Sequence, residues 1–303
     1  MVLIVQPQKV CSTYGNERIL SNRPPAAKQI VILRTVRPGL TPVGLPMLIC
    51  GRMSNSYYAL GKQRATKVRA LFARIARRYD LLNDLQSCGL HRIWKRRAIE
   101  LAGVKPGSSV LDLCCGTGDL AFGLAQKGAC VIGLDFSNEM LDIARARQQS
   151  AAKDSRCNNF QTIQFIQGDA QVLPFPRESF DAVTVGYGLR NLVNWEAGLA
   201  EMVRVVKPGG QVVVLDFGKP DNPGWRMIYF TYLRVMVPIL GLLFCADAAA
   251  YAYILKSLKQ YPAQHGVDAK MRGLGLTDLR ILNFFGAAMT INCGRKPVVS
   301  LPP

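Results

Sequence analysis

The feature that most constrains the fold is a glycine-bearing turn in residues 110–119, which read VLDLCCGTGD. An apolar strand pattern over Ser109–Leu113 leads into a loop with Gly116 and Gly118, and a helix pattern follows over Asp119–Gln126. Glycines let the backbone approach a ligand closely, and the amides at a helix start face whatever lies above the strand end. We therefore expect a ligand to lie over this turn.

Strand and helix patterns alternate through the middle of the chain. Further strands are expected at 130–134, 163–166, 182–186 and 211–215, and further helices at 138–148 and 195–206. The last helix is expected to end at Lys207-Pro208-Gly209-Gly210, which is a stop signal. Leu279–Phe284 and Ala287–Cys293 are expected to form an antiparallel hairpin. This order predicts an α/β fold with a doubly wound, seven-stranded sheet, mostly parallel, with one antiparallel strand near the C-terminus.

Acidic residues follow the next two strands at positions that suit a nucleoside. Asp135 ends the second strand, 23 residues beyond Asp112, and an acid there accepts hydrogen bonds from ribose hydroxyls. That position fits both NAD and S-adenosylmethionine. A dinucleotide turn would continue as Gly-x-Gly-x-x-Gly, but Ala121 stands at the third glycine position. Gly168-Asp169-Ala170 after the third strand is the methyltransferase arrangement, so S-adenosylmethionine is the expected cofactor.

The charge of the chain is concentrated at one end. Of the net charge of +18, residues 1–79 contribute +13, because they carry 14 basic residues against the single acid Glu17, and the remaining 224 residues contribute +5. The catalytic body is therefore not expected to bind nucleic acid. Nine cysteines without metal-ligand spacing indicate neither a disulfide framework nor a metal site, and favour a reducing compartment.

Residues 1–60 are expected to be an irregular basic extension ahead of a catalytic domain over residues 61–303. They contain several prolines and show no sustained hydrophobic period. An Arg-rich, acid-poor composition suits an organelle transit peptide. Alternatively, translation starts at Met47 or Met53 and the segment is an upstream extension of the start site. Both interpretations stay open.

An apolar run of 18 residues, Met227–Phe244, has the length at which a membrane span must be considered. Arg234 and Pro238 fall inside it, and a charge within a span is costly. We therefore expect an apolar lid helix that covers the sheet or an apolar substrate, rather than a span.

Five motifs together resemble one enzyme family. They read RYDLLND from Arg78, HRIWKR from His91, DLCCGTGD from Asp112, YGLRN from Tyr187 and VVKPGG from Val205. The YGLRN motif is the most specific, because generic methyltransferases do not carry it. From about Val68 to Lys296 the chain is similar to the ubiquinone/menaquinone biosynthesis C-methyltransferases. The resemblance implies a class I, Rossmann-like methyltransferase fold.

The resemblance also implies a set of cofactor contacts. Thr117 is expected at the methionine end, Asp135 at the ribose, and Asp169 with Ala170 near the adenine. Some members carry a serine where this chain has Gly186, so only backbone is left at that contact. The full expected set comprises Asp112, Gly116, Thr117, Gly118, Asp135, Phe136, Asp169, Ala170 and Gly186.

The reaction implied is methyl transfer from a sulfonium to an electron-rich carbon of a quinol ring. Such a reaction mostly requires in-line alignment and stabilisation of a phenolate. Arg190 is the expected electrostatic partner of that phenolate, or positions a water, because a guanidinium stays protonated and does not act as a base. Tyr79 and Asn191 are expected to orient the ring oxygens, with Asp80 a weaker candidate. His91 is expected to be structural.

A demethylmenaquinol-type substrate is expected first, with phylloquinone and ubiquinone precursors behind it. A prenylated naphthoquinol lies in lipid, so we expect the enzyme at the membrane surface: peripheral on the inner membrane from the cytoplasm, or in a chloroplast or another organelle if residues 1–60 are a transit peptide. The sequence leaves open whether the chain acts alone or as a homodimer. One rival interpretation is a non-catalytic scaffold subunit of a quinone-synthesis complex, and another is a nucleic-acid methyltransferase.

Overall fold

The computed structural model describes residues 62–76, 79–151, 160–245 and 248–298, which belong to one compact unit, Arg52–Pro303. The extension expected over residues 1–60 lies outside the described residues.

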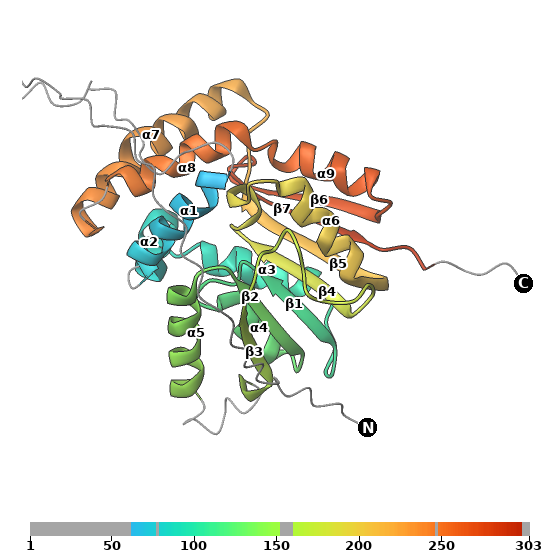
Figure 1. Ribbon diagram of the computed structural model, residues 1–303. Helices are drawn as coiled ribbons and strands as arrows, with labels where there is room; N and C mark the ends of the chain where they lie inside the picture. Colours follow the sequence, from blue (N-terminus) through green and yellow to red (C-terminus); the bar gives the residue numbers. More distant parts are fainter. Residues whose placement is uncertain (1–61, 77–78, 152–159, 246–247, 299–303) are drawn as a thin grey trace, which may run out of the picture. The chain divides into compact units, whose positions relative to one another are not determined.

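A single seven-stranded sheet organises the described chain (Figure 1). In sequence order the strands are β1 (Ser109–Leu113), β2 (Cys130–Asp135), β3 (Ile163–Gln167), β4 (Phe180–Gly186), β5 (Val206–Phe217), β6 (Thr277–Phe284) and β7 (Met289–Arg295). Their spatial order is β3-β2-β1-β4-β5-β7-β6. The first five strands pair in parallel, and β7 is antiparallel to both of its neighbours. The predicted sheet with one antiparallel strand is confirmed.

Helices cover both faces of the sheet. The helices on one face are α3 (His91–Leu101), α4 (Asp119–Gln126) and α5 (Asn138–Ala151), whose side chains share one apolar core cluster with the sheet. On the other face, α6 (Trp195–Val205) and α9 (Ala263–Gly273) contribute to a second cluster. Strands buried on both faces explain the nearly continuous apolar runs of β1 and β4.

The carboxyl ends of β1, β2, β3 and β4 meet at one edge of the sheet because these strands are parallel. Three further helices contribute side chains to the core cluster that contains α6 and α9: α1 (Lys62–Ile75), α7 (Pro223–Cys245) and α8 (Ala248–Gln260). Figure 1 shows α7 and α8 lying side by side, and α2 (Tyr79–Ser87) contacts α7. Ligands of open α/β sheets bind outside the strand carboxyl ends, so this edge is where a site is expected.

The apolar run that was considered as a membrane span lies within α7, a helix of 23 residues. Among the described helices, none combines the length and the apolar character that crossing a membrane requires. Tyr229, Leu233 and Val237 are buried in the core, whereas Met227 and Met236 are exposed. The helix therefore has one face against the protein, as the prediction of a lid helix requires.

Two helices were not predicted. Neither α8 nor α9 was expected between the apolar run and the C-terminal hairpin. α9 contains Gly266 and ends at Gly273, and glycines weaken a helix pattern. Packing of its buried Val267 and Met271 onto the sheet supplies the stability that local propensity lacks.

Candidate active site

Two cavities of similar size adjoin each other at the carboxyl edge of the sheet. The first, here called the strand-end cavity, has a volume of about 410 Å³ and lies over the ends of β1, β2, β3 and β4. The second, the apolar cavity, has a volume of about 440 Å³ and is lined mainly by α2, α3, α7 and α8. Phe72 and Tyr187 line both cavities, so a group bound in one lies next to a group bound in the other.

Asp135 forms a fixed acceptor in the strand-end cavity. Its carboxylate is 5% exposed and accepts hydrogen bonds from the backbone N–H of Gly116 and of Ser137, each at 2.9 Å. Burial raises the pKa of Asp135, although these backbone donors oppose the rise. The two bonds hold the carboxylate in one orientation and leave lone pairs free for hydroxyl groups, as a ribose requires.

Most of the predicted cofactor residues come together around the strand-end cavity. Phe136, Asp169, Ala170, Gly186 and Gly116 all line it with Asp135. Asp169 is exposed, and its carboxylate accepts a hydrogen bond of 2.9 Å from the Gln171 N–H, which orients it at the cavity edge. No atom lies within 4 Å of a Cβ built at Gly116, whereas one at Gly186 would meet Leu120 at 2.8 Å.

Gly118 has a steric role at the start of α4. It caps α4 with a φ of +89° and lines neither the strand-end cavity nor the apolar cavity. A Cβ there would lie 2.9 Å from Phe122 and 3.0 Å from Phe165. This glycine therefore lets the turn enter the helix against an aromatic core, and its contact with a cofactor stays a prediction.

Asp112 and Thr117 line a third, small cavity of about 30 Å³ beside the glycine turn. Asp112 is 1% exposed; its Oδ1 accepts a hydrogen bond of 2.8 Å from Thr184, and its Oδ2 has no partner among the described residues. Burial raises the pKa of Asp112 to about 7. The Thr117 hydroxyl donates to Asp80 at 2.9 Å, which connects α2 to the glycine turn.

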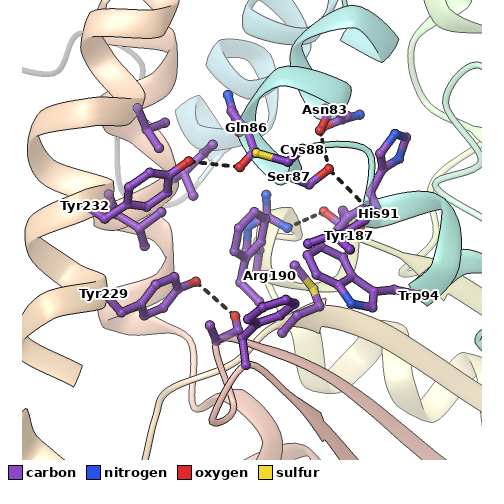
Figure 2. A pocket seen from close by; sticks show the side chains of 18 of the residues that line it. Asn83, Gln86, Ser87, Cys88, His91, Trp94, Tyr187, Arg190, Tyr229 and Tyr232 are labelled. Atoms are coloured by element: carbon purple, nitrogen blue, oxygen red, sulfur yellow. Dashed lines mark hydrogen bonds between the residues drawn. The ribbon is translucent and has the colours of Figure 1, made fainter. Parts of the chain in front are cut away.

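Arg190 lies between the two walls of the apolar cavity (Figure 2). The guanidinium is buried, donates to Asp216 at 2.6 Å and to the Tyr187 carbonyl at 2.7 Å, and stacks 4.6 Å from the centre of the Phe217 ring. From the sequence we expected Arg190 to be the partner of the phenolate on the quinol ring. We did not predict its ion pair with Asp216. Because that carboxylate balances the charge, a ligand beside Arg190 would meet an ion pair rather than an uncompensated cation.

The other two predicted catalytic residues are placed differently. Asn191 lines the strand-end cavity rather than the apolar one, and its amide donates to the Tyr187 carbonyl at 2.9 Å. The predicted role of Asn191 in orienting ring oxygens stays a prediction, and it requires the ring to reach the boundary with the strand-end cavity. Tyr79 begins α2, but its side chain lies outside the described part of the structure.

Several residues of the apolar cavity were missed as site residues. Figure 2 shows Tyr229 and Tyr232 of α7 on one side of Arg190, and His91 and Trp94 of α3 on the other. His91 is buried, and its Nε2 lies 2.8 Å from an Asp84 carboxylate oxygen. Burial lowers the pKa of His91, although Asp84 opposes the fall. The HRIWKR motif was the available signal, since it carries both α3 residues on one helix face.

Tyr187 is the residue on which the two cavities converge. It directly follows β4 and lies in the left-handed region with a φ of +60°, an uncommon conformation for a residue with a large side chain. Its ring packs against Phe217 at 5.8 Å between centres. Strained backbone of this kind clusters at ligand sites. The sequence marked Tyr187 only as the first residue of its motif.

Comparisons with known proteins identify the family of this chain. The profile of the ubiE/COQ5 methyltransferase family matches residues 60–296. The chain is 41% identical to the demethylmenaquinone methyltransferase of Desulfitobacterium hafniense, over 78% of this chain and 92% of that protein. It is 40% identical to the ubiquinone/menaquinone biosynthesis C-methyltransferase UbiE of Ectopseudomonas mendocina, over 78% and 91%.

A solved structure supports the fold. A putative S-adenosylmethionine-dependent methyltransferase from Methanococcus maripaludis superposes with a TM-score of 0.53 at 18% identity, over 77% of this chain and 96% of that one. At this identity the likeness concerns the fold alone.

Proposed function

Because this chain belongs to the ubiE/COQ5 methyltransferase family, we propose that it transfers a methyl group from S-adenosylmethionine to a ring carbon of a prenylated quinol. Demethylmenaquinol is the substrate that we propose first, and phylloquinone and ubiquinone precursors are the alternatives. The relative from Desulfitobacterium hafniense is named for demethylmenaquinone, whereas the other relative is named for both quinone classes.

The strand-end cavity fits the cofactor of an S-adenosylmethionine-dependent methyltransferase. Its buried carboxylate, Asp135, suits two neighbouring hydroxyls, and Asp169 at the edge suits an exocyclic amine. The open space around the Cα of Gly116 leaves room for a ligand against the backbone. The two carboxylates are acceptors of the kind that the ribose hydroxyls and the amine of an adenosine require, and with Gly116 they lie at the ends of three neighbouring strands.

The methyl transfer requires little covalent catalysis by the protein. When bound, S-adenosylmethionine supplies an electrophilic methyl group on a positively charged sulfur. The ring carbon takes this methyl group, forming a C–C bond as the C–S bond breaks, and then gives up its proton to water. The protein must align the ring with the methyl group and stabilise negative charge on the ring oxygen. Tyr187 and Phe72, which line both cavities, are the side chains that align the two groups.

The observation that carries this proposal is the apolar cavity next to the strand-end cavity. Aromatic and aliphatic side chains make up most of its lining, and its volume of about 440 Å³ is in the range of ligand sites. A bicyclic ring fits there with room for the beginning of an isoprenoid chain. Arg190 is the cation in its wall, and it is placed to stabilise an oxyanion within the limits set by its pairing with Asp216.

The direct experiment is a methyl-transfer assay with isotopically labelled S-adenosylmethionine. Short-chain demethylnaphthoquinol and demethylbenzoquinol are compared side by side, and the product is identified by mass spectrometry. We expect methylation at a ring carbon, faster with the naphthoquinol. Faster turnover of the benzoquinol would overturn the substrate proposed first, and binding of S-adenosylmethionine without methylation of either quinol would favour the scaffold interpretation.

We further propose that the enzyme docks on a lipid surface through the outer face of α7. Met227, Ile228 and Met236 are exposed on that helix, and Arg226 and Arg234 are exposed beside them. An apolar face with adjacent cations suits a helix lying at an anionic membrane surface. Ile228 also lines the apolar cavity, so an isoprenoid chain leaving the cavity would meet this face.

Vesicle sedimentation with phosphatidylglycerol-containing liposomes tests the docking. We expect binding that high salt weakens, and a clear reduction in Met227→Asp. The matched control is Val298→Asp, because Val298 is 69% exposed and Met227 68%. Turnover of a long-chain quinol in liposomes should fall only in Met227→Asp, while a water-soluble short-chain analogue is turned over normally. Equal vesicle binding by both variants would contradict docking through α7.

A further inference from the structure

The apolar cavity has a buried end and an exposed end. Tyr187, which also lines the strand-end cavity, and Arg190 are both buried. Among the aromatic and aliphatic side chains of the described residues that line the apolar cavity, three are exposed: Trp225, Ile228 and Phe285. A side chain that lines a cavity and also meets solvent lies at its opening. The cavity therefore opens between the start of α7 and the turn that joins β6 to β7.

The turn between β6 and β7 has an unusual backbone. Phe285, Gly286 and Ala287 follow one another in the left-handed region, with φ values of +50°, +60° and +69°. Residues other than glycine rarely adopt this region, and they adopt it singly rather than in succession, so other contacts must hold the turn. The Trp225 indole N–H donates to the Phe285 carbonyl at 2.7 Å, and a Cβ built at Gly286 would lie 2.8 Å from that indole. The start of α7 thus holds the turn in its strained conformation.

This conformation keeps the Phe285 ring at the opening of the cavity rather than in the core. The ring is 55% exposed and lies 6.1 Å from the Trp94 ring of α3, at an interplanar angle of 78°. Trp225 on the other side of the turn is 38% exposed. Exposed aromatic surface gains free energy when an apolar group covers it. A strained turn that presents such surface at a cavity opening is therefore suited to an apolar ligand.

We propose that Trp225 and Phe285 bind the first isoprene units of the quinol's chain, and that this pair sets the preference of the enzyme for a prenylated ring over a ring without a chain. This inference rests on the proposed function. With the quinol ring beside Arg190 at the buried end, a chain attached to the ring extends toward the opening. Isoprene units are apolar and branched, so aromatic side chains cover them without any polar partner.

Methyl-transfer kinetics with three demethylnaphthoquinols, which carry zero, one or two isoprene units, test this site in solution without lipid. In the wild type we expect kcat/KM to rise about 10- to 100-fold across the series, because each unit buries apolar surface. In Phe285→Asn this rise should shrink to within about threefold, with the loss falling on the prenylated substrates. Asparagine tolerates the left-handed region, so the turn keeps its conformation while the apolar ring is removed.

Further variants separate binding of the chain from the shape of the turn. Phe285→Leu keeps an apolar side chain and should retain most of the rise. Trp225→Phe keeps apolar surface but loses the hydrogen bond to the Phe285 carbonyl, so we expect an intermediate rise. The matched control is Ile93→Asn, because Ile93 is 50% exposed on α3 and lines neither the apolar cavity nor the strand-end cavity. This control should keep the wild-type rise.

The outcomes distinguish the inference from the proposed function. The inference is wrong if Phe285→Asn keeps the wild-type rise, if it loses turnover of all three substrates equally, or if Ile93→Asn loses the rise to the same extent. It is also wrong if the wild type turns over the three substrates equally well. If the wild type methylates none of them, the proposed function itself fails.

Discussion

The strand-end cavity and the apolar cavity adjoin each other, yet they are built in different ways. The strand-end cavity consists of loops that directly follow β1, β2, β3 and β4, and its polar groups are fixed by backbone hydrogen bonds such as those to Asp135. The apolar cavity is assembled from helices far apart in the sequence, and one of its bonds, Tyr232 to the Gln86 carbonyl at 2.9 Å, spans 146 residues.

This difference separates two tasks. A cofactor common to many methyltransferases is bound by a few residues at strand ends, where parallel strands bring them together in any fold of this class. The proposed quinol site consists of side chains whose proximity depends on long-range packing. We therefore expect substitutions in one cavity to change one ligand's affinity and to spare the other's, and the following predictions test this separation from the largest effect to the smallest.

The largest effect is expected at the buried ion pair of the apolar cavity. Arg190→Ala leaves Asp216 buried without its cation, which should cost about 3–5 kcal/mol in the free energy of unfolding. Quinol turnover should collapse, while the affinity of the folded fraction for S-adenosylmethionine stays within about threefold. Urea unfolding and calorimetry measure the two quantities. In the double variant Arg190→Met/Asp216→Asn the stability should partly recover without turnover. A large loss of affinity for S-adenosylmethionine in Arg190→Ala would show that the two cavities do not bind their ligands independently.

Asp112 should make the stability of the protein depend on pH. Its pKa is raised to about 7 by burial, with Asp135 adding to the rise and Lys95 and the Thr184 hydroxyl opposing it. Between about pH 4 and pH 7 the native state then binds a proton that the unfolded state has lost. Stability contributed by this group therefore falls as the pH rises through that window.

The measurement compares unfolding free energies at pH 4.5 and pH 8 without cofactor. Asp112→Asn should reduce the difference between the two values by about 2–4 kcal/mol relative to wild type. The same slope in both proteins would show that Asp112 is ionised in the native state.

The contrast between the cavities also explains what the sequence revealed. The turn at Gly116 and the acids Asp135 and Asp169 were predictable because each lies at the end of a strand or within three residues after it, and the strand order is fixed by right-handed crossovers. The steric reason for a glycine at position 118 was not predictable, because Phe122 and Phe165 approach it and Phe165 lies on another strand.

The apolar cavity was predictable only in part. The helix α7 was predictable from its apolar run, and its role as a lid stays a prediction. The pairing of Asp216 with Arg190 was not predictable, because the two residues are 26 positions apart and meet only through the pairing of β4 with β5. Asn191 was assigned to the ring by its place beside Arg190. In the short 3-10 helix Leu189–Asn191, neighbouring side chains point in different directions, so the two residues reach different cavities.

In the strand-end cavity, Asp135→Ala tests whether Asp135 binds the cofactor. It removes a buried carboxylate from the proposed ribose position, and we expect the binding free energy of S-adenosylmethionine to weaken by about 1–3 kcal/mol. The affinity for the quinol, measured by fluorescence quenching of the apolar cavity's tryptophans, should stay the same. Circular dichroism confirms folding. Unchanged cofactor affinity in a folded variant would remove Asp135 from the site.

The smallest effect concerns how α7 is held over the apolar cavity. Tyr232→Phe removes the hydroxyl that donates to the Gln86 carbonyl of α2, and Tyr229→Phe removes one that donates to the Ala288 carbonyl beside β7 at 3.0 Å. Each should cost about 0.5–1.5 kcal/mol in unfolding free energy, because each breaks one hydrogen bond.

Only Tyr232→Phe releases α2, so hydrogen exchange of the α2 amides should accelerate in that variant and not in Tyr229→Phe. The KM for a long-chain quinol should rise with it, while cofactor affinity is unaffected. Equal exchange in the two variants would mean that α2 is held by other contacts and that the wall formed by α2 and α7 is not closed by this bond.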